Sequence, residues 1–570
     1  MNKILCFIAA SLVFIAAPAW AKTLYVDIAD GGCSDSTTYA NNDADNPWCT
    51  LGRAVWGNAS RSSSDSGEAA DAGDTVRVAA GTYSTSEYSS DETIPVYNPV
   101  NSGTSGNRIV FEASGTVILQ GTGTGLRGGC GPLIGSYNHD YITWDGFTLN
   151  EANINVVGDT GPVEVHTADY ITLQNLTLIG TTVTWADNHN AIRVEFADEL
   201  LVKNCDISDF HVTGTSSRNG AAILFYHTND AVIEFNKIHR NNSGIYIKGL
   251  NPGTVTIRYN WIEDNDSEGI AIGGSDSSRI YQNVIINNDS FGITYQFWSD
   301  PAPINAWVVN NTLYNNGTGQ IYLKPSCEYG ANNYIYNNIM VGATNVIYDE
   351  CGSLSTSDID FEHNNYHGNS GIQNGGSLAS WQSAGHDASA PATTESDPLF
   401  TAEGADFTLQ AGSPCREGQS NDGIDILDLD LDGSTVDAIT IGAYITGNEE
   451  IGIESGEGDS TAPVVEITTS DPQNITSNTL AISGTASDAV GVTGCKFRVG
   501  AAPTESTGTA ITGTTAWSGT ATGFSEGANT LYVGCDDAAN NWGSDSITVN
   551  FTYLSDPILG IIVSNLIITK

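Results

Sequence analysis

The feature that most constrains the fold is an asparagine that returns at the same place in a repeated hexapeptide. Segments such as IEFNKI (233–238), IRYNWI (257–262) and IYQNVI (280–285) have apolar first and sixth positions. From residue 144 onward, nine such segments begin at intervals of 23 to 31 residues. Because Asn tolerates left-handed backbone and bonds to neighbours along a stack, this pattern predicts turns piled along one axis. The fourth positions are, in order, Phe147, Leu176, Cys205, Asn236, Asn260, Asn283, Asn311, Asn338 and Asn364.

A second apolar strand follows each of these turns. Sequences such as AILFY (222–226), GIYIK (244–248) and GIAIG (269–273) alternate with period two, which predicts one buried and one exposed face. Polar turns, among them HRNNS and EDNDS, separate the two strands. Short strands, polar turns and a repeat of this length together predict a solenoid in which each repeat is one coil.

Over residues 22–446 the chain resembles the secreted right-handed parallel β-helix repeat proteins. Besides the repeat, PWCTLGRAVWGNA (47–59) resembles the helix that caps such solenoids, and SDPLFTAEGADFTLQAGSPCREG (396–418) resembles their closing segment. The resemblance implies an all-β fold, a right-handed parallel β-helix. It implies no single activity, because this scaffold carries lyases, hydrolases, adhesins and inert spacers.

Both ends of the chain carry further signals. Residues 1–21 have a basic start, an apolar run and an A-x-A site, the features of a secretory signal peptide, so we expect a secreted or cell-surface protein. After an acidic, Gly-rich linker at 447–461, short alternating strands over 462–553 predict a β-sandwich that resembles bacterial Ig-like domains. The apolar tail at 554–570 is too short to span a bilayer, so no transmembrane span is expected.

Charge and cysteine content narrow the range of partners. A formal net charge of -46 excludes nucleic acid, whose phosphates need a basic surface. We expect a monomer. An exported chain can form disulfides, and Cys495 and Cys535 are expected to join the two sheets of the sandwich. Local pairing predicts Cys33–Cys49, Cys327–Cys351 and Cys495–Cys535, and leaves Cys130, Cys205 and Cys415 unassigned.

If the isoleucines of the second strands point inward, their neighbours form an outer wall. The side chains expected on this wall include Arg193, Glu195, Tyr226, Tyr246, Lys248, Gln296, Tyr322, Lys324, Ile347 and Asp349. Rings and scattered charges along such a face favour binding of an extracellular polysaccharide. The residues expected to bind it are Glu195, Gln296, Trp298, Tyr322 and Lys324. The alternative interpretation is a wall of ordinary exposed strand residues.

Cleavage of a uronic-acid polymer by β-elimination is the most specific hypothesis for this wall. The reaction needs a positive charge to offset the carboxylate and a base that removes the α-proton. We expect Lys248 as the base, Arg193 as the neutralising cation, and Tyr226 or Tyr246 as the acid. Neighbouring carboxylates, which favour a charged lysine, weigh against Lys248 as the base.

Calcium is the only cofactor that the sequence suggests. Carboxylate oxygens are its preferred ligands, and Glu195 with Asp264, Asp266 or Asp276 could supply them. Two other classes of function stay open. One is a non-catalytic adhesion or structural protein, for which the length of the rod is the useful property. The other is a glycoside hydrolase, which needs two carboxyl groups about 5–9.5 Å apart.

Overall fold

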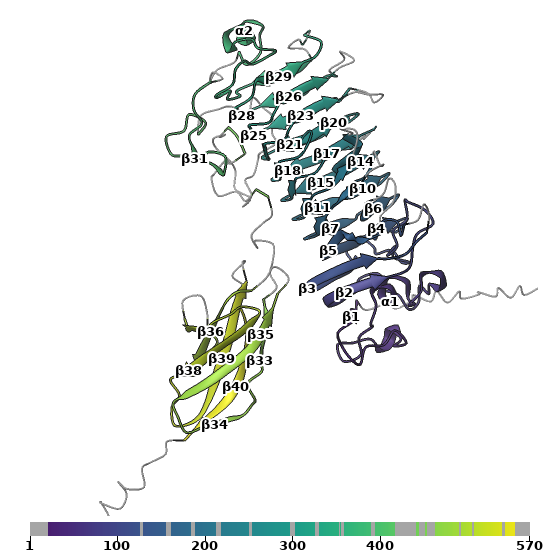
Figure 1. The fold of residues 1–570 in the computed structure, drawn as a ribbon, viewed down its shortest axis with the longest axis vertical. Helices are drawn as coiled ribbons and strands as arrows, with labels where there is room; N and C mark the ends of the chain where they lie inside the picture. The colour runs from purple at the N-terminus through teal and green to yellow at the C-terminus, as the bar shows by residue number, and fades with distance from the viewer. Residues whose placement is uncertain are drawn as a thin grey trace, which may run out of the picture.

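The structure, a computed structural model, shows a long solenoid of stacked parallel strands (Figure 1). A separate unit, whose strands pair mainly antiparallel, follows it in the chain. The residues that the structure describes are 21–125, 129–155, 161–183, 188–212, 218–249, 253–296, 302–324, 330–352, 354, 358–388, 394–416, 441–443, 451–452, 462–488, 492–503, 507–537 and 542–552.

Between residues 172 and 349, each coil of the solenoid contributes two short strands to a 19-stranded sheet and one strand to a nine-stranded sheet. In one coil these strands are β15 (Ala231–Glu234), β16 (Lys237–His239) and β17 (Ser243–Lys248). They pair in parallel with β18 (Val255–Arg258), β19 (Trp261–Glu263) and β20 (Ile270–Ile272) of the next coil. The repeated hexapeptide therefore supplies the first two strands, and the second apolar segment supplies the third.

The other strands of the nine-stranded sheet are β4 (Ile134–Tyr137), β6 (Val163–His166), β10 (Ile192–Glu195), β14 (Ala221–Tyr226), β23 (Phe291–Gln296), β26 (Gly319–Lys324) and β29 (Asn345–Asp349). The first strands of the larger sheet are β1 (Thr23–Val26), β2 (Thr75–Thr85), β3 (Ile109–Gly121) and β5 (Ile142–Ile154). It continues with β7 (Thr172–Gln174), β8 (Thr177–Ile179), β11 (Leu201–Lys203), β12 (Asp206–Ser208), β21 (Ser278–Tyr281) and β22 (Val284–Ile286). Its last strands are β24 (Trp307–Val309), β25 (Thr312–Tyr314), β27 (Asn333–Tyr336), β28 (Ile339–Val341) and β30 (Ile359–Glu362).

The predicted asparagine stack is confirmed. The backbone N–H and the side-chain amide of Asn236 both donate to Oδ1 of Asn260, at 3.0 and 2.9 Å. The same pair of bonds continues from coil to coil as far as Asn364. The stack then ends on the fully buried Asp387, whose Oδ1 accepts from Asn364 and whose Oδ2 accepts from Tyr366 and Trp381.

A second asparagine stack lies at the next corner of the coils. Here the backbone N–H of Asn241 donates to Oδ1 of Asn265 at 2.9 Å, and the amide of Asn265 donates to Asn288 at 2.8 Å. Asn288 donates in turn to Asn316. All four side chains are buried. The polar turns between the two predicted strands are therefore structural parts of the core.

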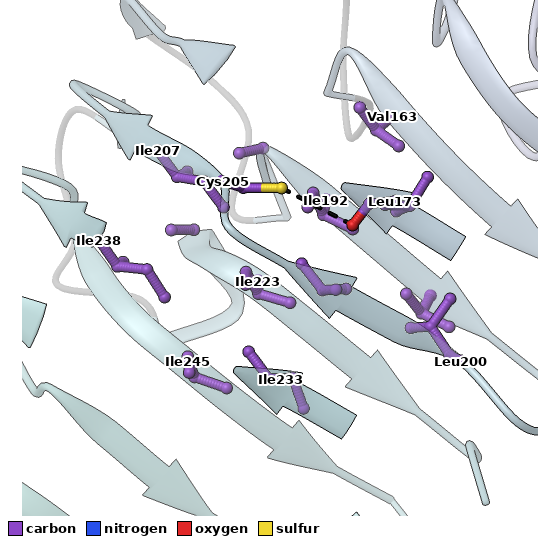
Figure 2. Packing of buried hydrophobic residues seen from close by; sticks show 14 of the residues in the cluster. Val163, Leu173, Ile192, Leu200, Cys205, Ile207, Ile223, Ile233, Ile238 and Ile245 are labelled. Carbon is purple, nitrogen blue, oxygen red and sulfur yellow. Dashed lines mark hydrogen bonds between the residues drawn. The ribbon is translucent and has the colours of Figure 1, made fainter. Parts of the chain in front are cut away.

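The interior between the sheets is filled with aligned aliphatic side chains. In Figure 2, Val163, Ile192, Ile223 and Ile245 follow one another along the nine-stranded sheet and point toward the larger sheet. All are at most 1% exposed, and burying each contributes roughly 1.5–3 kcal/mol. Cys205 lies in the same interior as a buried free thiol, and burial raises its pKa to about 12.

Both ends of the solenoid are covered, which protects their strands from pairing with other chains. Helix α1 (Leu51–Trp56) buries all six of its residues at the first end, as its sequence predicts. At the other end, α2 (Leu378–Ser383) buries Trp381, whose ring stacks on His386. The closing segment, with β31 (Phe400–Ala402) and β32 (Asp406–Leu409), packs on the outer side of β22 and β28.

Residues 462–552 contain two further sheets around their own core. One holds β33 (Val464–Ile467), β35 (Thr479–Ser487) and β38 (Ala516–Thr522). The other holds β34 (Gln473–Ile475), β36 (Val492–Val499), β37 (Thr509–Ala510), β39 (Gly527–Asp537) and β40 (Trp542–Phe551). The likeness to bacterial Ig-like domains stays a prediction. Residues 1–20, nearly all of the linker, and the tail lie outside the described residues.

Two of the three predicted disulfides are present, Cys33–Cys49 and Cys495–Cys535. Cys351 is also disulfide-bonded, and its predicted partner Cys327 lies outside the described residues. The expectation that Cys495 and Cys535 join two sheets is wrong, because they lie opposite each other on adjacent strands of one sheet. Among the described residues, no helix has the length and the apolar character needed to cross a membrane.

Candidate functional site

Two columns of side chains point outward from the nine-stranded sheet. The strand register defines the first column as Glu164, Arg193, Leu224, Tyr246, Ala271, Thr294, Tyr322 and Tyr348. The second column contains Tyr137, His166, Glu195, Tyr226 and Lys248. Successive members of a column are about 4.8 Å apart, because they lie on neighbouring strands.

The middle of the first column is buried, which corrects the expectation of an exposed wall. Tyr246 is 2% exposed and Thr294 is fully buried. Leu224, Tyr246 and Ala271 form a small apolar cluster, and the short 3-10 helix η4 (Arg218–Gly220) contacts the strands β14 and β17 beneath it. Tyr246 is therefore not positioned to reach a polymer.

The last coil differs from the expected register by one residue. Ile347 pairs with the inward-facing Ile321, so Tyr348 is the outward residue. Asp349 is buried, and its carboxylate accepts bonds from the backbone of Cys351 and Leu354. The expectation that Ile347 and Asp349 face outward is therefore wrong. The alternation fails because two successive apolar residues of β29 are both buried.

Five aromatic rings form a continuous row beside the second column, which we call the aromatic row. His166 contacts Tyr137 at a centroid distance of 5.7 Å and Phe196 at 5.6 Å. Phe196 contacts both Tyr226 and His227, at 6.0 and 5.1 Å. The Phe196 side chain is 49% exposed. The row thus offers an apolar surface to solvent across four successive strands.

Lys248 lies at one end of this row. Its Nζ donates to Oδ1 of Asn219 at 2.9 Å and lies 5.6 Å from the centre of the Tyr226 ring. The rings of Tyr226 and His227 are 4.1 Å apart. Gly249 permits this arrangement, because its φ is 81° and a Cβ there would lie 3.0 Å from the Tyr226 ring. Among the described residues, none bonds to the Tyr226 hydroxyl. The phenol of Tyr226, the imidazole of His227 and the ammonium of Lys248 therefore lie close together, and the hydroxyl is available to a ligand.

Arg193 is held by a carboxylate at the middle of the row. Its guanidinium donates through Nε and Nη2 to Oε1 of Glu195, and the Nε bond is 2.8 Å long. The other oxygen of Glu195 lies 3.5 Å from Nδ1 of His166. Burial raises the pKa of Glu195, but His166 and Arg193 together outweigh burial and lower it. The charge of Arg193 is thus balanced within the protein. Arg193 therefore suits a structural role beside Glu195 and His166 better than the role of neutralising a polymer.

Glu164 is the most unusual group near the row. Its side chain is 1% exposed, and among the described residues neither of its carboxyl oxygens has a hydrogen-bond partner. Burial raises its pKa well above the ordinary value of 4.5, and nearby Arg193 opposes the shift only in part. Burial therefore favours the neutral, protonated form of Glu164.

The raised pKa of Glu164 predicts how stability depends on pH. A pKa that is higher in the folded than in the unfolded state gives stability that is fully present below the unfolded value and is lost as pH rises through the folded value. Gln cannot lose a proton, so Glu164→Gln should become more stable than the wild type as pH rises. Thermal unfolding at about pH 5 and about pH 8 measures this difference.

Glu195→Gln is the matched control, because the pKa of Glu195 is lowered. Its native carboxylate gives stability that is present above the unfolded pKa and lost in acid. The Gln variant should therefore be weakened most at about pH 8, opposite to Glu164→Gln. Parallel pH profiles for the wild type and Glu164→Gln would contradict a raised pKa of Glu164.

The remaining predicted site residues are scattered. Trp298 and the side chains of Gln296 and Lys324 lie outside the described part of the chain. Tyr322 is outward and half-buried, three strands beyond Lys248. The candidate calcium ligands are dispersed: Asp264 follows β19, Asp266 bonds to His211 at 2.9 Å, and Asp276 precedes β21. Within the described ranges, no three His, Cys, Asp or Glu residues form a group that could hold a metal ion, and calcium binding stays a prediction.

His166, Phe196 and His227 were not anticipated from the sequence. Phe196 and His227 each follow a strand of the nine-stranded sheet and have left-handed backbone, with φ of 53° and 54°. Residues with such backbone also end strands at many other corners of the solenoid. The position directly after each second strand is thus a periodic corner, and following it along the sequence would have found the exposed rings.

The fold and its outward columns define the class of protein. Residues 145–340 match a family described as "Right handed beta helix region", and the parallel pairing from coil to coil agrees with it. The solenoid part of the chain therefore has the fold of a right-handed parallel β-helix.

Three solved structures are similar to this chain at low identity. The A-module of the Azotobacter vinelandii mannuronan C-5 epimerase AlgE4 is 12% identical with a TM-score of 0.35, covering 62% of this chain and 96% of that one. The periplasmic alginate epimerase AlgG is 12% identical with a TM-score of 0.25, over 57% of this chain and 76% of that one. The PL6-family alginate lyase AlyGC is 14% identical with a TM-score of 0.31, over 71% and 58%. At these values the function must be argued from this chain's own residues.

Proposed function

We propose that the chain is an exported carbohydrate-active protein whose aromatic row binds an acidic polysaccharide, and that Tyr226, His227 and Lys248 cleave this polymer by β-elimination. The observation that carries the proposal is a row of contacting, partly exposed rings that ends at an ammonium group. Flat rings stack on the CH faces of sugars. An ammonium beside them suits a sugar that carries a carboxylate.

The elimination follows from the three groups at the end of the row. His227 takes the proton from C5 of a uronate, and the electrons of that bond form a C4=C5 double bond. The C4–O4 bond breaks, and the Tyr226 hydroxyl donates its proton to the leaving O4. Lys248 offsets the negative charge that grows on the carboxylate. The ammonium lies over an aromatic ring, which favours its charged form, so this role suits Lys248 better than that of a base.

The charge of the whole chain affects how a polyanion approaches. A net charge of -46 repels a uronic-acid polymer at low ionic strength. At physiological salt the screening length falls to about 8 Å, so the local contacts with Lys248 determine whether the polymer binds. Binding and cleavage should therefore increase as salt is raised from very low ionic strength.

The direct test combines a binding measurement and a cleavage measurement on the full mature chain. Soluble uronic-acid polymers and neutral polymers are offered, and retardation in polymer-containing gels is compared with the growth of ultraviolet absorbance from the new double bond. Phe196→Ala should weaken binding of the uronic-acid polymer by roughly tenfold, because one stacking ring is lost. Phe196 is half exposed, so the fold should be unaffected.

Tyr170→Ala is the matched control, because Tyr170 is an exposed ring that stacks on Tyr141 at another corner of the solenoid. It should bind like the wild type. Retardation without any new absorbance would contradict the elimination and leave a binding protein. Equal losses in Phe196→Ala and Tyr170→Ala would contradict the aromatic row as the binding surface.

Export is part of the same proposal. The disulfides require an oxidising compartment, and the first 21 residues have the pattern of a signal peptide. A polysaccharide outside the cell would then be accessible to the solenoid.

A further inference from the structure

A second group of rings lies on the nine-stranded sheet, three strands beyond Lys248 in the direction of α2 (Figure 1). Tyr322 of β26 and Tyr348 of β29 are register partners with ring centroids 5.5 Å apart. Phe291, the first residue of β23, lies 4.5 Å from the Tyr322 ring and 6.1 Å from the Tyr348 ring. We call these three residues the distal platform.

The three residues of the distal platform differ in their exposure to solvent. Phe291 is 6% exposed and packs against both tyrosines, whereas Tyr348 is 37% exposed. The Tyr322 hydroxyl donates to Oε2 of Glu350 at 2.7 Å, and Glu350 itself is exposed. The platform thus has a rigid apolar surface with a hydroxyl and a carboxylate at its rim.

The distal platform is separate from the aromatic row. Between the two, the first column passes through Ala271 and Thr294, which are 1% and 0% exposed. About 14 Å separates the strand of Lys248 from the strand of Tyr322, since three strand spacings of about 4.8 Å lie between them. A ligand on the platform therefore makes its own contacts.

We propose that the distal platform is a second sugar-binding site, and that it takes neutral hexose units rather than uronates. Rings of this arrangement stack on a pyranose face. The Glu350 carboxylate accepts hydrogen bonds from sugar hydroxyls but repels a second carboxylate. The aromatic row has the opposite local charge, because it ends at the ammonium of Lys248. The platform's specificity does not depend on elimination at Tyr226.

The test uses the full chain in affinity gels that contain a soluble glucan, a galactomannan or polygalacturonate. Tyr348→Ala should lower the affinity for the bound neutral polymer about tenfold and leave retardation by polygalacturonate unchanged. Glu350→Gln should keep neutral binding and gain retardation by polygalacturonate, since the repelling charge is removed. Thermal unfolding of both variants checks that the fold is intact.

Tyr334→Ala is the matched control, because Tyr334 is a half-buried ring that contacts Trp307 on the larger sheet. Its binding should equal that of the wild type. The distal platform is rejected if no neutral polymer retards the wild type, or if Tyr348→Ala and Tyr334→Ala behave alike. Phe196→Ala and the uronate absorbance assay report on the aromatic row alone, so failure of either proposal is seen separately.

Discussion

Replacing Lys248 with Ala should reduce uronate elimination about a thousandfold, because the charge that stabilises the developing carboxylate dianion is lost. Tyr226→Phe should cause a loss of similar size, since it keeps the ring of the aromatic row and removes only the proton donor. Measurements of polymer binding should distinguish the two variants. Tyr226→Phe should be retarded by the polymer like the wild type, whereas Lys248→Ala should bind more weakly. Initial rates of absorbance growth and gel retardation measure the two effects.

Lys203→Ala provides a close control for the loss of a lysine. Lys203 also lies over a ring, 5.0 Å from the centre of Phe235, but on the larger sheet. Its replacement removes the same charge from the same acidic chain and should leave elimination unchanged. Lys248→Arg should recover part of the lost rate, because it restores a cation at slightly different geometry. Full activity in Lys248→Ala would exclude this lysine from the reaction.

The local sequence pattern predicts the solenoid well, because successive coils bury the same kinds of side chain at the same positions. Inward aliphatic residues recur from coil to coil, and a buried asparagine recurs in six successive coils from Asn236 to Asn364. A misread segment in one coil is therefore corrected by the pattern of its neighbours. The second stack was within reach of the same reasoning. Asn241, Asn265, Asn288 and Asn316 each follow an asparagine of the first stack by five residues.

The candidate site was predicted only in part, because its accessibility is decided by segments that do not repeat. The alternation places Tyr246 and Lys248 on one face, and both do point outward. Whether a side chain there meets solvent depends on what lies above it, and Tyr246 is buried while Lys248 is half-buried. The connection that includes η4 varies from coil to coil, so no periodicity reveals its position.

The sequence pattern also did not reveal all of the groups that the charged residues contact. Arg193 and Glu195 are two residues apart on one strand, which places them on one face. Their bond was therefore foreseeable, but His166 lies one coil away and completes the group only through the strand register. Glu164 shows the limit most clearly, because nothing in VEVH indicates a carboxyl group that has no hydrogen-bond partner among the described residues.

Asn283→Ala should destabilise the solenoid by about 4 kcal/mol, since it leaves several buried polar groups unpaired at once. The Asn283 amide donates to the carbonyl oxygens of Ile257 and Tyr281 and to Oδ1 of Asn311. Its Oδ1 accepts from the backbone N–H and the amide of Asn260, both at 3.0 Å. Chemical denaturation followed by circular dichroism measures the free energy of unfolding.

Asn315→Ala isolates burial as the cause of this loss. Asn315 also donates its amide to an asparagine oxygen, that of Asn287 at 2.9 Å, but the pair is exposed. Water can replace that bond, so the variant should lose no more than about 1–2 kcal/mol, most of it because Ala disfavours the left-handed backbone of Asn315, whose φ is 52°. Asn283→Asp should be as harmful as Asn283→Ala, because it keeps the acceptor and removes every donor. Similar losses for Asn283→Ala and Asn315→Ala would mean that the buried stack adds no more stability than a surface amide pair.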